Sequence, residues 1–288
     1  MEQRAIQWFP GHMARTDREI EKNMRLADAV VEILDARIPV SSRNPDLGRM
    51  IGDRPRVLLM NRSDLADAAE TARWIASFRS RGLPAVAADC KTGKGVPSLL
   101  PQIEDLLSEK MAAWRARGMA GRKIRIMVVG IPNVGKSSLI NRLAGGSRAA
   151  AENRPGVTRA SSWFPVGKRF ELLDTPGVLW PKITDNAMGE RLAFTGAIRD
   201  EVVDRELLAC RLLETLRALA PAGLRSRWKL SEADLAAGGY GLLEAAARRR
   251  GMLAGGGSAD TERAARALLE EFRGGKLGRI TLECVAKP

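Results

Sequence analysis

Apolar and polar positions follow two patterns in the first 175 residues of the chain. Short, nearly continuous apolar runs at 29–34, 56–60, 84–88 and 124–129 predict buried strands, and a pair at 163–166 and 170–173 predicts a hairpin. Between these runs, apolar residues recur at helical spacing at 14–26, around Trp74 to Phe78, at 99–117 and at 138–143. Strands that alternate with helices indicate a doubly wound, mostly parallel sheet of the α/β class.

The strand pattern ends near residue 185. Beyond it, helical spacing predicts helices at 201–220, 242–250 and 261–272, and Pro221 ends the first of them. We therefore expect two domains. Residues 1–185 would form the α/β domain with an N-terminal helical extension, and residues 186–288 a small all-α domain.

The run at 124–129 leads into the segment GIPNVGKS at 130–137, which has the pattern G-x-x-x-x-G-K-[ST], and then into a predicted helix. A strand, a glycine-rich turn and a helix in this order are typical of a P-loop, whose backbone N–H groups converge on phosphate oxygens. Lys136 is expected to bind the β- and γ-phosphates, and Ser137 to ligate Mg²⁺. A turn without a ligand is the alternative, which the coincidence of all three features disfavours.

Three more places in the sequence carry groups suited to a nucleotide and its metal: two lie at the ends of predicted strands and one lies in a polar stretch. Asp174-x-x-Gly177 suits Mg²⁺ binding through the carboxylate and γ-phosphate binding through the Gly177 N–H. Thr158, in the polar stretch 145–160, can offer oxygen ligands to the metal when a γ-phosphate orders that stretch. Asn61-x-x-Asp64 offers a carboxylate that accepts two hydrogen bonds from guanine and would be left unpaired by adenine.

A second contact to the base is expected from Asp89-Cys90-Lys91, where Lys91 can lie along the purine and the backbone near Cys90 can donate to the guanine oxygen. GTP or GDP with Mg²⁺ is thus the predicted ligand, and an ATPase remains the interpretation if Asn61 and Asp64 are not at the base. The residues expected to contact the nucleotide are Asn61, Arg62, Asp64, Asp89, Cys90, Lys91, Asn133, Val134, Gly135, Lys136, Ser137, Ser138 and Gly177.

These motifs stand in an unusual order. In the common arrangement the P-loop comes first and the base-selecting motif last, whereas here 61–64 and 89–95 precede 130–137. The order indicates a circularly permuted, Ras-like P-loop GTPase. Permutation preserves the sheet, but the segment after Gly177 now leads directly into the helical domain.

The chain resembles the circularly permuted ribosome-biogenesis GTPases of the YlqF/RbgA type over nearly its whole length. The resemblance lies in the permuted motifs, in Trp8 to Met13, in Asp35 to Pro39, and in the tail from Phe272 to Arg279 with Thr281-Leu282-Glu283. It implies a GTPase that acts in late maturation of the large ribosomal subunit. Such a protein would bind ribosomal RNA partly through its helical domain and be released on hydrolysis.

The sequence departs from the family pattern at two places in the base-selecting motifs. Arg62 stands where the family usually has Lys, whose side chain packs across the P-loop and the base. Asp89-Cys90-Lys91 replaces the more usual Ser-Ala-Lys. Neither change affects the expected ligands of the metal or the phosphates.

Hydrolysis needs a residue that orients the attacking water, and Val178, which follows Gly177, cannot hydrogen-bond to it. The resemblance implies His12, the single histidine, for this role, beside Lys136, Thr158 and Gly177 as further catalytic groups, with turnover stimulated by the subunit. It also implies that Asn133 helps to bind K⁺. The alternatives are a capping role for His12 and a turn role for Asn133.

The chain has a formal net charge of +13 and a pI near 10.4, which favours a polyanionic partner, although a solvated basic surface is the alternative. From 204 to 288, 15 Lys and Arg stand against 11 Asp and Glu, so most of the excess precedes the helical domain. The cations expected to contact RNA phosphates are Arg37, Arg43, Arg154, Arg225, Arg227, Lys229, Arg248, Arg249 and Arg250.

Three widely separated cysteines indicate a reducing compartment, and no run approaches the ~20 apolar residues of a membrane span, so a cytoplasmic monomer that does not bind membranes is expected. The competing function is a non-ribosomal switch protein whose GTP form recruits a protein partner. The basic pI and the helical domain disfavour it.

Overall fold

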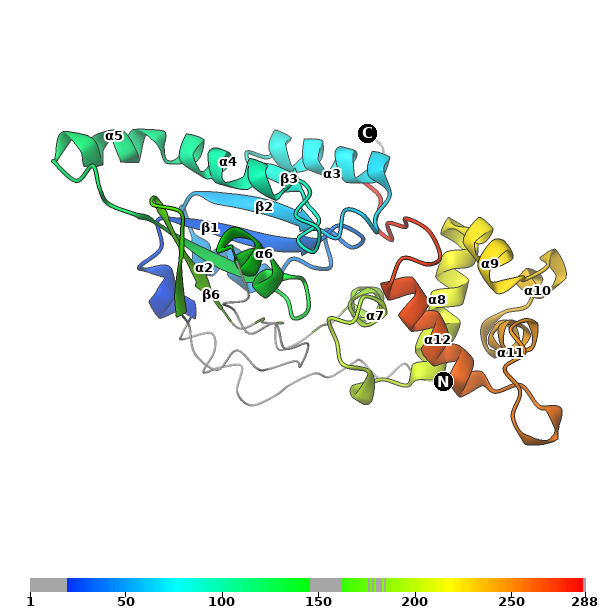
Figure 1. Cartoon of the computed structure of the whole chain (residues 1–288). Coiled ribbons are helices and arrows are strands. Elements are labelled where there is room, and N and C mark those ends of the chain that lie inside the picture. The colour runs from blue at the N-terminus through cyan, green and yellow to red at the C-terminus, as the bar shows by residue number, and fades with distance from the viewer. Residues whose placement is uncertain are drawn as a thin grey trace. The chain divides into compact units, whose positions relative to one another are not determined.

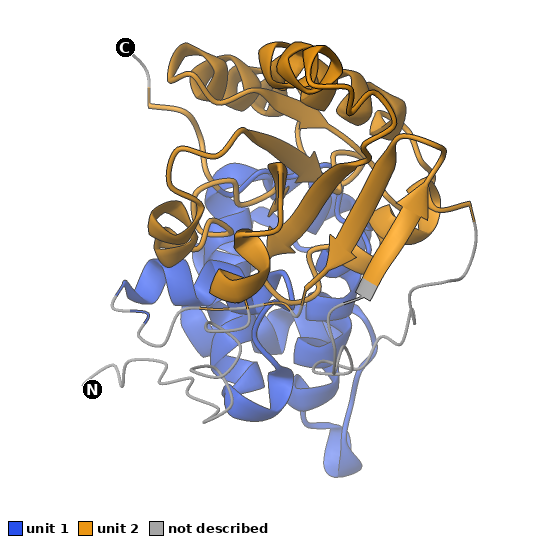
Figure 2. Cartoon of the chain, turned by 90° about the vertical axis from the view of Figure 1, so that its left-hand side faces the viewer, with its two compact units in different colours: residues 1–8, 183–282 blue, residues 9–182, 283–288 orange. Residues whose placement is uncertain are grey.

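A computed structural model of the chain describes residues 20–145, 162–175, 177, 179, 183 and 185–286. Within these ranges the chain divides into two compact units, coloured separately in Figure 2. The sheet unit comprises the described residues up to 179 together with 283–286, and the helical unit comprises 183 and 185–282.

The sheet unit is built on six strands in the order β3-β2-β1-β4-β6-β5 (Figure 1). All neighbouring pairs are parallel except β5 and β6, which form the predicted hairpin. The P-loop α/β fold predicted from the alternation of strands and helices is confirmed. The strands are β1 (Ala29–Asp35), β2 (Arg56–Asn61), β3 (Ala85–Ala87), β4 (Ile124–Gly130), β5 (Ser162–Val166) and β6 (Phe170–Asp174).

Helices cover the sheet, and the central strands are therefore buried over most of their length. All seven residues of β1 are buried, which explains why its sequence is an almost continuous apolar run. Its Leu34 belongs to an apolar cluster that includes Trp74 and Phe78 of α3 (Ala68–Ser80). Figure 1 shows α3, α4 (Leu99–Leu106) and α5 (Ser108–Ala116) along one side of the sheet.

Two features of the helices in the sheet unit differ from the prediction. The segment 99–117, expected as one helix, is two, because the backbone leaves helical geometry at the buried Leu107 (φ −100°, ψ 6°). The short helix α2 (Pro45–Ile51) was not predicted, although Asn44 accepts a hydrogen bond from the N–H of Asp46 and Pro45 occupies the first turn, a recognised start signal. The last helix of the unit, α6 (Lys136–Leu143), follows the P-loop.

The described part of the helical unit consists of helices and turns without a named strand. In it, α8 packs against α11 and α12, and leucines at helical spacing in α8 are buried between them. Pro221 ends α8 and also begins α9, since proline is favoured in a first helical turn. The helices are α7 (Asn186–Phe194), α8 (Arg205–Leu219), α9 (Pro221–Trp228), α10 (Glu232–Ala236), α11 (Gly239–Arg249) and α12 (Thr261–Arg273).

The division into units differs from the predicted single boundary after 185. The helical unit begins at 183 and ends at 282, and residues 283–286 belong to the sheet unit, where Glu283 and Val285 form hydrogen bonds. These pairings join residues more than 200 positions apart, which a local sequence pattern cannot indicate. Among the described residues, no helix is long and apolar enough to cross a membrane.

Candidate nucleotide-binding site

Two of the predicted site residues, Asn61 and Asp174, end strands at the same edge of the sheet. Strands β2, β1, β4 and β6 are adjacent and parallel, so their carboxyl ends share an edge. The last residues of these four strands are Asn61, Asp35, Gly130 and Asp174. Ligands of open α/β sheets bind beyond this edge.

The glycines of the P-loop are required by positive φ angles and by close neighbours. Gly130 has φ 154°, and a Cβ there would lie 2.6 Å from the carbonyl oxygen of Ile33. Gly135 has φ 109°, and a Cβ there would lie 2.2 Å from Nδ2 of Asn61. Neither position admits a side chain without displacing its neighbour.

Lys136, the first residue of α6, is buried inside this loop. Its Nζ donates to the carbonyl oxygens of Gly130 at 3.0 Å and Ile131 at 2.7 Å. Burial lowers the pKa of the Lys136 ammonium to about 8, against the opposing attraction of the Asp174 carboxylate. The amine is thus held beside the loop whose N–H groups are expected to bind phosphate.

Ser137 and Asp174 provide oxygen ligands suited to Mg²⁺. The Ser137 hydroxyl donates to Oδ2 of Asp174 at 3.3 Å, and the buried Oδ1 of Asp174 has no hydrogen-bond donor among the described residues. Burial raises the pKa of this carboxyl, while the charge of Lys136 lowers it. Carboxylate and hydroxyl oxygens, with water completing the shell, fit Mg²⁺, which would also supply the partner that Oδ1 needs.

Gly177 lies against the P-loop, as its predicted role requires. A Cβ at this position would be 2.8 Å from Nζ of Lys136 and 2.8 Å from Cα of Pro132. Between Asp174 and Gly177, the Thr175 hydroxyl donates to the carbonyl oxygen of Val128 at 2.6 Å, which fixes the end of β6 to β4. The structure therefore brings Asp174, Gly177 and Lys136 together.

Asn61 connects two loops of the site. Its Nδ2 donates to the carbonyl oxygen of Val134 at 2.6 Å, and its Oδ1 accepts the N–H of Cys90 at 2.9 Å. The Cys90 N–H is therefore bound to Asn61, and the contact from the backbone near Cys90 to a guanine oxygen stays a prediction. The carboxylate of Asp64, in contrast, is exposed in the turn that follows β2.

Asp89 is a structural residue of the following loop. Its carboxylate accepts the N–H groups of Lys91 at 2.8 Å and Thr92 at 3.3 Å, and the Thr92 hydroxyl. Burial alone would raise the pKa of Asp89, but these hydrogen bonds hold it below its usual value. Lys91 has an exposed side chain, whereas the thiol of Cys90 is buried and its pKa is raised to about 12.

Arg62 lies across the P-loop and is near an acidic residue that the sequence reasoning did not assign to the site. Its Nη2 donates to the carbonyl oxygen of Asn133 at 2.9 Å, and its Nε lies 4.0 Å from Oδ2 of Asp35. Asp35 also binds Arg37 through two side-chain hydrogen bonds of 2.9 and 2.7 Å. Arg37 is only 1% exposed, so its predicted contact with RNA is wrong.

The other cations predicted to contact RNA differ in whether they are ion-paired, exposed or outside the described residues. Four arginines of the helical unit are ion-paired with carboxylates, which reduces their attraction for phosphate: Arg225 with Glu232, Arg227 and Arg250 with Glu271, and Arg249 with Asp234. Arg43 pairs with Glu32 in the sheet unit. Lys229 and Arg248 are exposed. Arg154, His12, Thr158 and Val178 lie outside the described residues.

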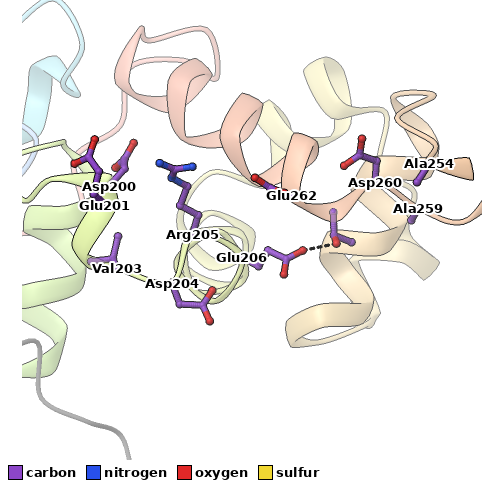
Figure 3. Close-up of a pocket in the computed structure, with 11 residues that line it drawn as sticks. Asp200, Glu201, Val203, Asp204, Arg205, Glu206, Ala254, Ala259, Asp260 and Glu262 are labelled. Atoms are coloured by element: carbon purple, nitrogen blue, oxygen red, sulfur yellow. Dashed lines mark hydrogen bonds between the residues drawn. The ribbon is translucent and has the colours of Figure 1, made fainter.

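The helical unit contains an open groove of about 540 Å³ with acidic walls (Figure 3). Its lining includes six carboxylates and one arginine, Arg205, and Glu206 accepts a hydrogen bond from the Thr261 hydroxyl. Such a surface repels phosphate groups, so it is not the nucleotide site. The carboxylates belong to Asp200, Glu201, Asp204, Glu206, Asp260 and Glu262.

Known proteins resemble this chain over nearly its entire length. The family model of the 50S ribosome-binding GTPases matches residues 125–215, a range that includes the P-loop and Asp174 but not Asn61. A protein named ribosome biogenesis GTPase A from Bacillus cereus is 43% identical over 96% of this chain and 93% of its own length. The protein of that name from Priestia megaterium is 44% identical over 96% of each chain.

A solved structure agrees with the described fold. The crystal structure of GNP-bound YlqF from T. maritima has a TM-score of 0.65 and 27% sequence identity, and the match covers 94% of this chain and 98% of that one.

Proposed function

Because this chain belongs to the family of the ribosome biogenesis GTPases A, which are GTP-hydrolysing assembly factors of ribosomal subunits, we propose that it acts in late maturation of the large subunit. In this proposal the GTP form binds ribosomal RNA on a subunit precursor in the cytoplasm, and hydrolysis releases the protein as a monomer. The observation that supports it most is the convergence of Lys136, Ser137, Asp174 and Asn61 at one sheet edge in a strongly basic chain.

The expected chemistry follows from the positions of these groups. The Lys136 ammonium binds β- and γ-phosphate oxygens, and the Gly177 N–H donates to the γ-phosphate. Ser137, Asp174 and Thr158 would hold Mg²⁺, which neutralises the negative charge of the phosphates. Asp64, whose exposed carboxylate lies after β2, accepts from the guanine base.

Guanine selectivity is tested by calorimetry with GTP and ATP on the purified protein. We expect GTP to bind and ATP to bind at least about a hundredfold more weakly, because adenine leaves the Asp64 carboxylate without a donor. Asp64→Asn should reduce this preference. Equal affinities would exclude the proposed base contact.

The proposed association with the large subunit is tested by co-sedimentation of the protein with subunit precursors in the presence of a non-hydrolysable GTP analogue. Association should require the analogue and should weaken steeply with salt if phosphates dominate the contact. Stable binding to a protein partner in place of the precursor would support the non-ribosomal switch.

His12 is proposed to orient the attacking water when the subunit is bound. His12→Ala should then keep its affinity for GTP and lose the turnover that the subunit stimulates. Turnover at the unaltered rate would remove His12 from the mechanism.

Asn133 is proposed to support K⁺ binding next to the phosphates, where a cation stabilises the charge of the transition state. The residue lies in the P-loop with a positive φ of 58°. Turnover should be faster in K⁺ than in Na⁺. Asn133→Ala should remove that difference, and equal rates in the two salts would contradict the proposal.

A further inference from the structure

Two motifs that the nucleotide site does not use meet in the sheet unit. The first is the segment after β1, residues 36–42, and the second is the C-terminal strap, Glu283 to Val285. The Glu283 carboxylate accepts the N–H of Val40 at 2.6 Å, the N–H of Ser41 at 3.1 Å and the Ser41 hydroxyl. Glu283 is 8% exposed and its bonds to Ser41 are buried, away from bulk water, where hydrogen bonds to a charged group are strong.

Two further hydrogen bonds hold the C-terminal strap on α3. The carbonyl oxygen of Glu283 accepts from Nε1 of Trp74 at 2.7 Å, and the N–H of Val285 donates to Oε1 of Glu70 at 2.6 Å. The backbone of the strap is therefore fixed independently of the Glu283 side chain. A change confined to that side chain should leave the strap in place.

The segment that Glu283 binds is connected to the P-loop through polar contacts. The Ser42 hydroxyl accepts the N–H of Asp35 at 3.0 Å. The Asp35 carboxylate, 3% exposed, lies 4.0 Å from Nε of Arg62, and Arg62 donates to the carbonyl oxygen of Asn133 at 2.9 Å. A charged side chain with many rotamers is thus held over the P-loop by a buried carboxylate.

We propose that Asp35 and Glu283 are positioning residues for the bound nucleotide: Glu283 fixes the segment 36–42, Asp35 thereby orients Arg62 over the P-loop, and this slows nucleotide release. The inference rests on the proposed nucleotide site. The Arg62 side chain is 29% exposed and has many rotamers, so its contacts with Asp35 and Asn133 restrict a side chain that would otherwise move. Loss of the Glu283 charge should let Arg62 leave Asn133.

The test is the rate at which a fluorescent GDP analogue is released from the full-length protein in stopped flow. Glu283→Gln should release it roughly three- to tenfold faster, the range expected for a contact that acts through a network. Ser42→Ala, which removes the acceptor for the Asp35 N–H, should also accelerate release. Unchanged release in both variants would overturn the proposal.

The matched control is Asp28→Asn. Asp28 is as buried as Asp35 but lies at the opposite end of β1, where it binds Lys110, Arg122 and the N–H of Arg125. The Asp28→Asn variant should release the GDP analogue at the same rate as the unaltered protein. If Asp28→Asn accelerates release as much as Glu283→Gln, general destabilisation explains both results and the proposal fails.

A double-mutant cycle with Arg62→Ala separates positioning from a purely structural effect. Once Arg62 is absent, Glu283→Gln should change the release rate little, because the group it positions is gone. Additive effects would show that Glu283 acts by another route and would overturn the inference. An unaltered protein that does not bind GDP would overturn the proposed site instead.

Discussion

The two ends of β1 have the same chemistry and different surroundings. At the amino end, Asp28 accepts from Lys110 at 3.0 Å and Arg122 at 3.0 Å, whose side chains are 45% and 39% exposed. At the carboxyl end, Asp35 pairs with Arg37, which is almost completely buried. Each carboxylate is buried, but Lys110 and Arg122 can be rehydrated if Asp28 is lost, whereas Arg37 stays buried if Asp35 is lost.

The difference reflects what each end adjoins. Arg122 lies 4.1 Å from the Trp114 ring centroid and Lys110 5.3 Å from it, so the Asp28 cluster fastens α5 and the loop after it to the sheet. The Asp35 cluster adjoins Arg62 and the P-loop. The amino end therefore stabilises the fold, whereas the carboxyl end also adjoins the proposed nucleotide site.

The largest effect on GTP affinity is expected from Lys136→Ala, in the P-loop on the side of the carboxyl end of β1, compared with Asp28→Asn at the amino end. Loss of the ammonium removes the main charge on the phosphates, and affinity for GTP should fall roughly a thousandfold, about 4 kcal/mol. Asp28→Asn should leave the affinity unchanged. Calorimetry on both variants measures the contrast, and nucleotide binding that survives Lys136→Ala would exclude the P-loop as the site.

Asp35→Asn and Asp28→Asn should separate in stability. Without the Asp35 charge, the buried Arg37 guanidinium loses its carboxylate partner, and the free energy of unfolding should fall by about 3 kcal/mol. Asp28→Asn should cost about 1 kcal/mol, because its partners are half exposed. Denaturant unfolding of both variants gives the two values, and equal losses would contradict the assigned burial of Arg37.

The acid limb of stability sharpens this contrast. Burial alone would raise the pKa of Asp35, but Arg37 and Arg62 hold it below its usual value. A lowered pKa adds stability above the unfolded value of 3.8, and this stability is lost as the pH falls through the lowered pKa. Asp35→Asn should therefore flatten the decrease of stability below about pH 4, whereas Glu104→Gln, a control at an exposed ion pair, should not.

Gly135→Ala should disturb the site through geometry alone. Its Cβ would lie 2.2 Å from Nδ2 of Asn61, so the P-loop or Asn61 must move, at a cost of about 2 kcal/mol. Gly82→Ala is the matched control, since its φ of 73° is also left-handed but no atom lies within 4 Å of the added Cβ. The free energy of unfolding and the affinity for GDP are measured for both variants. Equal decreases in the two variants would mean that backbone strain, and not the contact with Asn61, is responsible.

The smallest expected effect is on pH dependence. Since the pKa of Lys136 is about 8 in the free protein and phosphate binding favours its charged form, affinity for GDP should fall about tenfold between pH 7 and pH 9. Lys136→Arg should bind with less change over that range, because arginine stays charged. An affinity that does not vary with pH in the unaltered protein would contradict the lowered pKa. The lowered pKa also makes the nucleotide-free fold more stable as the pH rises from 8 towards 10.5, because the unfolded chain still binds the proton.

The sequence by itself determined the strands and the P-loop, whereas it missed several helices, among them α2 (Pro45–Ile51). Short apolar runs located all six strands. Four of them, β1, β2, β3 and β4, have only parallel neighbours, and strands of a parallel sheet covered on both faces are mostly apolar. The P-loop was evident because its glycines and Lys136 are adjacent in the chain. Helix 99–117 was predicted as one element because the break at Leu107 comes from the backbone conformation of a residue that also suits a helix.

Only the tertiary structure decided which residues become partners. Asn61 reaches Val134 and Cys90, and Arg62 reaches Asp35 and Asn133, because β2, β1 and β4 are neighbours in the sheet. Glu283 reaches Ser41 across 242 positions of sequence. Local patterns encode which element a segment forms, whereas sheet order and packing determine which side chains meet.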